Sequence, residues 1–446
     1  ETMTDGQVEQ LEIRTTKLRM DSTQIASDIR DSSRLYLLVE GLRRLYHQLD
    51  EEEQATYAPL CEPYIKRESK HYTYGVKGRK ATDEAIQAIG LVLAEMLGEL
   101  QARYAEETVY QTIQRLFDDN YRLEEAIVVA KKNNEIGSSA LQSLDDLEAS
   151  FRRKAGEAYK GYVANITESC DEENEVQLIL DVQVAPNNTD DAVLLTETMP
   201  SLVERTEVDI LYTDGGYGSP KVDRVMNEHQ VEQIQSAIRG KAPDPSKLSL
   251  ADFVIEQDEQ GKPTHLTCPA GQRVDVNPAR TTGFVARFDQ TVCATCPLQL
   301  AGRCRTKPQK RDPRYALNFT QEQVFWAQRR HRHRTFLATP GNPRAAVEAS
   351  VRSVKHPFRQ GKLPVRGQFR VSCMMIASAA MCNVRRIHRY FVGNGLWRHF
   401  RYPNWLTTRR FRTVMGLNQH ICTRLTPIRR FLRRPLCRLR YTCFSY

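Results

Sequence analysis

The sequence predicts an α/β protein, in which a mixed sheet flanked by helices carries a helical insertion and a small cysteine-rich insertion. Three observations lead to this prediction. Strand-like patterns occur at residues 17–21, 158–186 and 208–213. Between the first two, residues 33–152 carry apolar side chains at the helical spacings of three and four. Four closely spaced cysteines occur in residues 268–304.

The length and composition limit the class of protein. A chain of 446 residues exceeds one ordinary hydrophobic core, so two or three domains are expected. The absence of an apolar run of 18 or more residues, and of a leader-like start, predicts a cytoplasmic protein without a membrane partner. In such a compartment, the eleven cysteines favour metal binding over disulfides.

The charge is distributed unevenly along the chain. Residues 351–446 contain 21 Lys and Arg and no Asp or Glu, which leaves 43 basic and 55 acidic side chains in residues 1–350. A basic block of this kind is typical of proteins that bind a phosphate backbone. Because Trp and Tyr alternate with the arginines, we expect a nucleic acid as the partner; a solvated tail or a membrane-surface segment is the alternative.

The strand and helix patterns follow one another in a definite order. Residues 17–21 are predicted to be a strand that ends in a carboxylate, and residues 33–150 a helical insertion. Its mixed charges favour packing within the chain, with coiled-coil dimerisation as the alternative. Residues 158–186 are predicted to be a β-hairpin, because the second half alternates strictly between apolar and polar side chains. A helix capped by Thr189 or Asp190 follows.

The next strand, at residues 208–213, runs into Asp214 and two glycines. Asp-Gly is typical of a hairpin turn, but a carboxylate can also be presented at the carboxyl end of a strand in an open α/β sheet. Without the helical insertion, the order is three adjacent strands, a helix and a fourth strand, as in an RNase H-like core. The first and fourth strands of that core are neighbours, so we expect Asp21 beside Asp214. Two convergent carboxylates suit a divalent metal ion.

A third carboxylate, Glu348, is the last acidic residue of the chain. It lies in a predicted helix that begins at Pro343 behind an N-cap at Asn342. In this helix Arg344, Glu348 and Lys355 share one narrow face. The alternative is that Glu348 forms only ordinary helix pairs with neighbouring arginines.

This combination resembles the DDE transposases of bacterial insertion sequences. The shared pattern is an Asp on the first strand, an Asp after the fourth, and a Glu within R-x3-E-x6-K on a helix. The segments DSTQIASDIRD, GYVANITE, VQVAPNNTDDA, DGGYG and EASVRSVKHPF with KLPVRGQFRV are similar to conserved blocks of this family. The likeness covers roughly residues 10–392.

The resemblance implies Mg²⁺-dependent DNA cleavage and strand transfer, with Asp21, Asp214 and Glu348 as the catalytic ligands of two Mg²⁺ ions. It also implies a homodimer or higher oligomer that binds double-stranded DNA, both the transposon ends and the target. Five cations are the expected DNA contacts: Arg344, Arg352, Lys355, Arg366 and Arg370.

The cysteine-rich insertion has the spacing C-x24-C-x2-C-x7-C, formed by Cys268, Cys293, Cys296 and Cys304. Four thiolates suit a tetrahedral, structural Zn²⁺ site in a zinc-ribbon-like module, and the resemblance includes a cysteine-bearing insert at this place. An iron–sulfur cluster or four unmetallated thiols are the alternatives. In the following segment, residues 326–336, arginines surround two histidines, so DNA contact is expected there rather than a metal.

Two other functions stay open, namely an inactive or domesticated transposase remnant that binds DNA, and an RNase H-like nuclease without strand transfer. Only 20 residues precede Asp21, so we expect the helical N-terminal domain of the family to be missing. The last segment is either a DNA-binding tail or a frameshifted extension. The expected segments are the first strand (1–32), the helical insertion (33–150), the core (151–239), the cysteine-rich insertion (240–340), the C-terminal core helices (341–392) and the basic tail (393–446).

Overall fold

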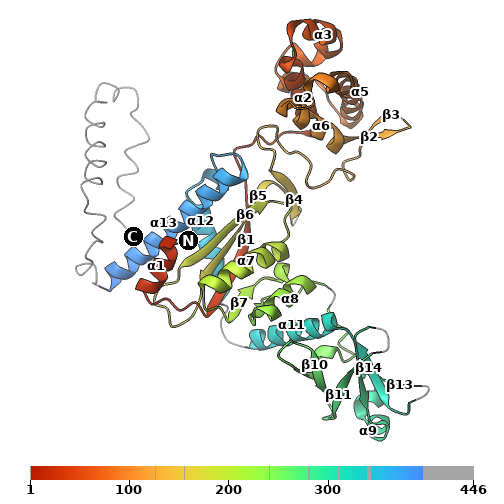
Figure 1. The fold of residues 1–446 in the computed structure, drawn as a ribbon, viewed down its shortest axis with the longest axis vertical. Helices are drawn as coiled ribbons and strands as arrows, with labels where there is room; N and C mark the ends of the chain where they lie inside the picture. Colours follow the sequence, from red (N-terminus) through yellow and green to blue (C-terminus); the bar gives the residue numbers. More distant parts are fainter. Residues whose placement is uncertain are drawn as a thin grey trace. The chain divides into compact units, whose positions relative to one another are not determined.

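The computed structural model describes residues 2–394, except for residues 126, 155, 241, 280–281, 310–311 and 339–342 (Figure 1). The chain divides into two compact units, Glu1–Arg386 and Ile387–Tyr446. The first unit contains the central sheet and both insertions. The predicted N-cap Asn342 and residues 395–446 of the predicted basic tail lie outside the described residues.

The central sheet has the order β4-β5-β1-β7-β8, with β6 also paired to β5 (Figure 1). β1 runs antiparallel to β5 and parallel to β7, and β7 runs parallel to β8. The mixed α/β class and the predicted neighbourhood of the first strand and the strand before Asp214 are therefore confirmed. The strands are β1 (Lys17–Ile25), β4 (Ser150–Lys154), β5 (Glu157–Ser169), β6 (Ile179–Pro186), β7 (Ile210–Thr213) and β8 (Glu232–Gln235).

The first strand is longer than predicted. It was expected to end at Asp21, but it continues to Ile25 because β5 extends past the end of β7 and supplies hydrogen-bonding partners there. The parallel pairing with β7 is shorter and ends with Arg19 opposite Tyr212. Asp21 is thus mid-strand with respect to β5, and lies just beyond the paired part of β7.

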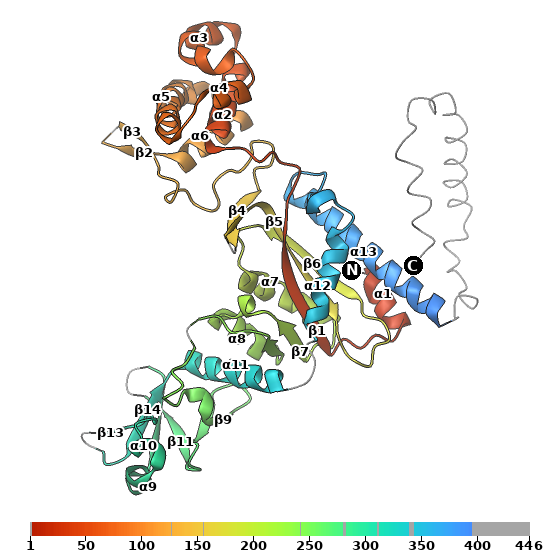
Figure 2. The same ribbon diagram turned by 180° about the vertical axis from the view of Figure 1, so that it is seen from behind.

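Helices cover both faces of the sheet and form its hydrophobic core (Figure 2). On one face Val163 packs against Leu194 of α7, and on the other Ala164 packs in a cluster with Val354 of α12 and Met375 of α13. β5 is buried on both faces from Gly161 to Ser169, which explains the adjacent apolar residues Tyr162, Val163 and Ala164. The helices of this layer are α1 (Thr2–Gln10), α7 (Asp191–Arg205), α8 (Pro220–Glu228), α12 (Ala345–Lys355) and α13 (Gln368–Gly393).

The segment between β1 and β4 has a hydrophobic core of its own. The predicted helical pattern forms five helices, and a short hairpin that was not predicted follows them. One described helix, α5, is long and apolar enough to cross a membrane, but its apolar residues Ile89, Leu93 and Met96 are buried in this core. The elements are α2 (Arg34–Gln48), α3 (Glu51–Ile65), α4 (Ser69–Gly75), α5 (Arg79–Tyr104), α6 (Thr108–Asn120), β2 (Tyr121–Glu124) and β3 (Ile127–Ala130).

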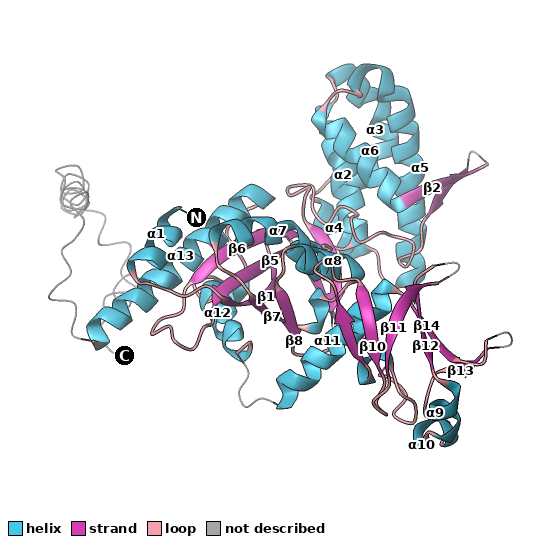
Figure 3. Cartoon of the chain, turned by 60° about the horizontal axis from the view of Figure 1, so that its bottom comes forward, coloured by secondary structure: helices cyan, strands magenta, loops and turns pink. Residues whose placement is uncertain are grey.

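The cysteine-rich segment forms a second, antiparallel sheet with the order β13-β14-β12-β11-β10-β9 (Figure 3). Phe288 is fully buried in its core, beside Cys293. The chain leaves this sheet through α11, Gln321–Ala338. The other elements are β9 (Val254–Gln257), β10 (Pro263–Thr267), β11 (Arg273–Pro278), β12 (Phe284–Phe288), α9 (Gln290–Thr295), α10 (Pro297–Leu300), β13 (Lys307–Pro308) and β14 (Tyr315–Phe319).

Candidate catalytic centre

Asp214 follows the last residue of β7 and caps the turn Gly215–Tyr217, since its Oδ1 accepts a hydrogen bond from Gly216 N at 2.6 Å. The chain then enters α8 and returns as the parallel strand β8, so the hairpin interpretation of Asp-Gly is wrong. A side chain at either Gly215 or Gly216 would come too close to neighbouring atoms. A Cβ on Gly215 would lie 2.7 Å from the carbonyl oxygen of Ala237, and one on Gly216 would lie 2.7 Å from Asp214 Oδ1.

Asp21 lies at the same height in the sheet as Asp214. The register pairs Arg19 with Tyr212, and two further residues along both strands align Asp21 with Asp214 on the same face. The side chain of Asp21 is largely buried and accepts a hydrogen bond from Arg344 Nη2 at 3.2 Å. Burial raises the pKa of Asp21, Arg344 lowers it, and Asp214 raises it again. The two aspartates are therefore close enough to repel each other.

Glu348 lies on the exposed side of α12, and its side chain is 55% exposed. Its Oε1 is 3.9 Å from Arg344 Nη1, so the guanidinium of Arg344 bridges Glu348 and Asp21. The helix begins at Ala345 rather than at the predicted Pro343, which lies in the preceding turn. Among the described residues, no three His, Cys, Asp or Glu side chains form a group that could hold a metal ion directly.

Two of the five predicted DNA-binding cations connect α12 to the first strand. Arg344 contacts Asp21 and Glu348, as described above. Lys355 Nζ donates to the carbonyl oxygen of Gln24 at 2.9 Å, and burial lowers the pKa of Lys355. Lys355 therefore attaches α12 to β1.

The other three predicted DNA contacts differ in their surroundings. Arg366 Nε donates to the carbonyl oxygen of Asp28 at 2.6 Å, and its guanidinium lies 3.5 Å from Asp145. Arg352 and Arg370 are exposed. The exposed pair has the surroundings expected of phosphate ligands, and DNA contact by all five stays a prediction.

A buried network that the sequence reasoning missed fixes the position of α12. Glu168 of β5 is fully buried and accepts hydrogen bonds from Arg19 Nε (2.7 Å), Ser350 Oγ (2.6 Å) and Arg386 Nη1 (2.8 Å). Arg19 also donates to the carbonyl oxygen of Pro343 at 2.7 Å. The network thus holds the chain on both sides of Glu348. The only sequence signal was a carboxylate at the end of the first strand of the predicted hairpin.

Tyr217 lies next to the aspartates and is fully buried. Its hydroxyl donates to Asn165 Oδ1 at 2.7 Å. Burial raises the pKa of Tyr217 well above its usual value, and Asp191, Asp21 and Asp214 raise it further. The hydroxyl therefore stays protonated close to three carboxylates.

The four predicted zinc ligands line one small cavity of about 20 Å³. Burial raises the pKa of Cys293, and Cys304, Cys268 and Cys296 raise it further. Gln272 Nε2 donates to Cys293 Sγ at 3.6 Å. The predicted convergence of the four thiols is present, but in the described part of the chain they do not have the separations of a metal site. Zinc binding therefore stays a prediction.

The basic stretch at residues 326–336 forms α11, and its inner side packs against the sheet. Arg329 is buried and lies 3.0 Å from buried Asp223 of α8. Arg332 donates to the carbonyl oxygen of Gln233, and His333 lies 3.0 Å from that of Gln235, both in the edge strand β8. DNA contact was expected for this whole stretch. For these three side chains that expectation is wrong, because they satisfy a buried carboxylate and edge carbonyl groups.

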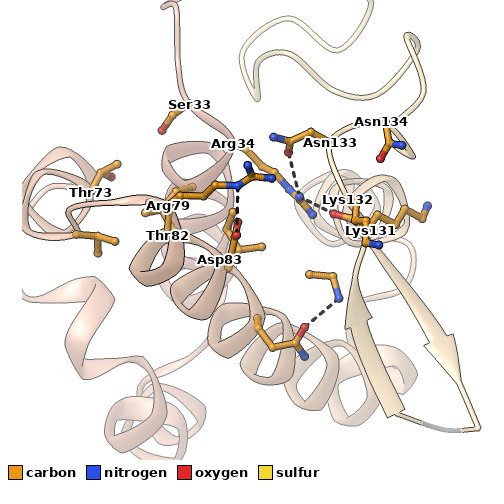
Figure 4. A pocket seen from close by; sticks show the side chains of 15 residues that line it. Ser33, Arg34, Thr73, Arg79, Thr82, Asp83, Lys131, Lys132, Asn133 and Asn134 are labelled. Atoms are coloured by element: carbon orange, nitrogen blue, oxygen red, sulfur yellow. Dashed lines mark hydrogen bonds and ion pairs between the residues drawn. The ribbon is translucent and has the colours of Figure 1, made fainter.

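A wider cavity, of about 1140 Å³, lies in the helical insertion, and neither Asp21 nor Asp214 lines it (Figure 4). It is lined by Arg34, Arg79, Lys131 and Lys132, among other polar side chains. Arg34 donates to the carbonyl oxygens of Lys131 and Asn120, so its guanidinium holds the hairpin segment to α2. The size of this cavity therefore does not identify a catalytic centre.

Comparison with known proteins shows one similarity. Residues 267–388 match the family model described as a transposase DDE domain. No curated protein and no solved structure gave a match. The matched range includes Glu348 and all four cysteines of the insertion, and it begins after Asp21 and Asp214. This stretch of the chain is therefore similar to the DDE domain of transposases, which confirms the predicted resemblance at the level of the family and supports a transposase function.

Proposed function

We propose that this protein is a transposase that cuts DNA and transfers the cut strand, with Asp21, Asp214 and Glu348 in one Mg²⁺-dependent centre. The observation that carries the proposal is the parallel pairing of β1 with β7, because Asp21 and Asp214 each follow the last pair, Arg19 with Tyr212, by two residues. The strand order, with the first strand between an antiparallel and a parallel neighbour, supports an RNase H-like core. The family match over residues 267–388 supports the same class of enzyme.

The donor chemistry of the centre fits Mg²⁺, which prefers carboxylate and water oxygens. Two Mg²⁺ ions, when bound, would activate a water molecule and stabilise the leaving oxygen of a phosphodiester. Burial is the main cause of the raised pKa of Asp21, and Asp214 adds to it, so a cation between the two aspartates would relieve their repulsion. Glu348 is exposed and can change rotamer without disturbing the core.

Arg344 and the exposed arginines are proposed to bind the DNA. The guanidinium of Arg344 offsets the negative charges of Asp21 and Glu348. It would also donate two parallel hydrogen bonds to a DNA phosphate next to the bond that is cut. Arg352 and Arg370 would bind phosphates further along the duplex. We also propose a structural zinc ion on Cys268, Cys293, Cys296 and Cys304, action on chromosomal DNA in the cytoplasm, and an oligomer on the transposon ends.

The test is nicking of a supercoiled plasmid that carries the DNA flanking this reading frame, with Mg²⁺ or with a chelator. Glu348→Gln keeps the size of the side chain but removes its charge, so it should reduce cleavage at least a hundredfold and leave DNA binding intact. Glu322→Gln is the matched control, because Glu322 is 56% exposed and also pairs with an arginine, Arg224. That variant should cut normally.

The outcomes separate the candidate functions. Cleavage that survives Glu348→Gln or the chelator would contradict the proposed centre. DNA binding without any Mg²⁺-dependent cleavage would favour the inactive remnant. Cleavage without joined products on a target plasmid would favour the nuclease.

A further inference from the structure

A fourth acidic residue, Asp191, lies beside the two strand carboxylates. Its side chain is only 1% exposed, at the first position of α7 behind the N-cap Asp190. Burial of an ionised carboxylate is costly unless both oxygens have partners. One oxygen, Oδ1, accepts a hydrogen bond from Ser22 Oγ at 2.8 Å, and Ser22 directly follows Asp21.

The other oxygen, Oδ2, is buried and has no hydrogen-bond partner among the described residues. The nearest cations are at ion-pair distances only: Arg239 Nη2 lies 4.0 Å from Oδ2, and Arg152 Nη1 lies 3.8 Å from Oδ1. The N-terminus of α7 favours a negative charge nearby. It does not supply the missing partner of Oδ2.

This oxygen points to the space next to Asp214. A Cβ placed on Gly216 would lie 2.8 Å from Asp191 Oδ2 and 2.7 Å from Asp214 Oδ1. Both oxygens thus lie within 2.8 Å of one point beside Gly216, and Arg239 Nη2 lies 3.0 Å from the same point. Because the described carboxylates do not form a direct three-residue metal site, water is needed between them and a cation. Mg²⁺ keeps several of its waters in protein sites.

We propose that Asp191 belongs to the divalent-cation site, and that its Oδ2 accepts a hydrogen bond from the hydration shell of the cation held by Asp21 and Asp214. The inference rests on the proposed function, because it assumes that those two residues bind a cation. Asp191 also holds Ser22 and thereby positions Asp21. It is a positioning residue, whose loss should weaken cation binding before any chemistry occurs.

The test is Mn²⁺ binding by the full chain, measured by titration calorimetry without DNA. Asp191→Asn should weaken Mn²⁺ binding by about 10- to 100-fold, as is typical when the outer-shell partner of a metal site is removed. The control is Asp190→Asn, a neighbouring exposed position with the same chemical change, where Asn is as good an N-cap as Asp. It should bind Mn²⁺ like the parent protein.

Thermal unfolding distinguishes a positioning role from a structural one. Without divalent cation, Asp191→Asn should unfold at the same or a higher temperature, because a buried charge is removed while Oδ1 still accepts from Ser22. A lower unfolding temperature together with unchanged Mn²⁺ affinity would overturn the inference. Asp21→Asn distinguishes a failure of this inference from a failure of the proposed catalytic centre. If it abolishes Mn²⁺ binding while Asp191→Asn does not weaken it, the inference fails alone; if the parent protein binds no Mn²⁺, the proposed centre fails as well.

Discussion

The network around Glu168 should hold the helix that carries Glu348, and removing its charge should loosen that helix. Glu168 is fully buried and accepts three hydrogen bonds, two of them from arginines. Hydrogen bonds to charged groups contribute about 1.5–3 kcal/mol each. Removing one partner of a buried ion pair costs about 3–5 kcal/mol, because the other charge stays buried. Glu168→Gln leaves the buried guanidinium of Arg19 without its charged partner. We therefore expect the free energy of unfolding to fall by about 3–5 kcal/mol.

The assay is hydrogen exchange followed by mass spectrometry of peptides from α12. Every 1.4 kcal/mol changes an equilibrium constant tenfold, so exchange in α12 should become faster by roughly a hundred- to a few-thousand-fold. Glu172→Gln is the control, since Glu172 forms an exposed pair with Lys17 at 2.6 Å next to the same sheet. An exposed pair contributes about 0–1 kcal/mol. Equal exchange rates in α12 for the two variants would refute the role of Glu168.

Two further predictions concern the cysteines and the buried Asp223. Elemental analysis should find about one zinc per chain, because four thiolate ligands form one tetrahedral site. The double variant Cys293→Ser, Cys296→Ser should contain no zinc. Zinc retained by this variant would exclude these two cysteines as ligands. Burial raises the pKa of Asp223 to about 6 against the opposing effect of Arg329, so the folded state binds this proton more tightly than the unfolded chain does. The stabilisation from this group is therefore complete below the unfolded pKa of about 4 and is lost as the pH rises through about 6. Urea unfolding at pH 4.5 and 7.5 should show this loss, and Asp223→Asn should remove the part of the pH dependence that arises here.

Several elements could be predicted because their signals are local. The alternation in residues 175–186 predicts a strand, and the spacing of three and four in residues 33–152 predicts helices, in both cases without reference to the rest of the chain. The pairing of the first strand with the strand before Asp214 also followed, because the order of the elements leaves few ways to complete such a sheet. The family resemblance depended on residue identities alone, and the match of residues 267–388 to a transposase DDE domain confirms it at the level of the family.

Other features depend on neighbours that are distant in the sequence. The end of β1 could not be located at Ile25, because its last residues are strand only where β5 lies beside them. The sequence could not predict which way the side chains of Arg329, Arg332 and His333 point, because a basic run on a helix has the same sequence pattern whether it faces DNA or an edge strand. Glu168 looked like a polar residue at the end of a strand.

For this protein, the sequence by itself determined the α/β class, the helical insertion, the cysteine spacing and the three carboxylates that resemble those of a transposase. These follow from periodicity and residue type, which act over a few residues. Only the tertiary structure decided that Arg344 bridges Asp21 and Glu348, and that Asp191 lies beside the Asp214 turn with one oxygen that has no hydrogen-bond partner among the described residues. The contacts of Arg344 with Asp21 and of Asp191 with the Asp214 turn join residues more than twenty positions apart. The partners of a buried charge, and therefore its role, depend on the groups that packing brings next to it.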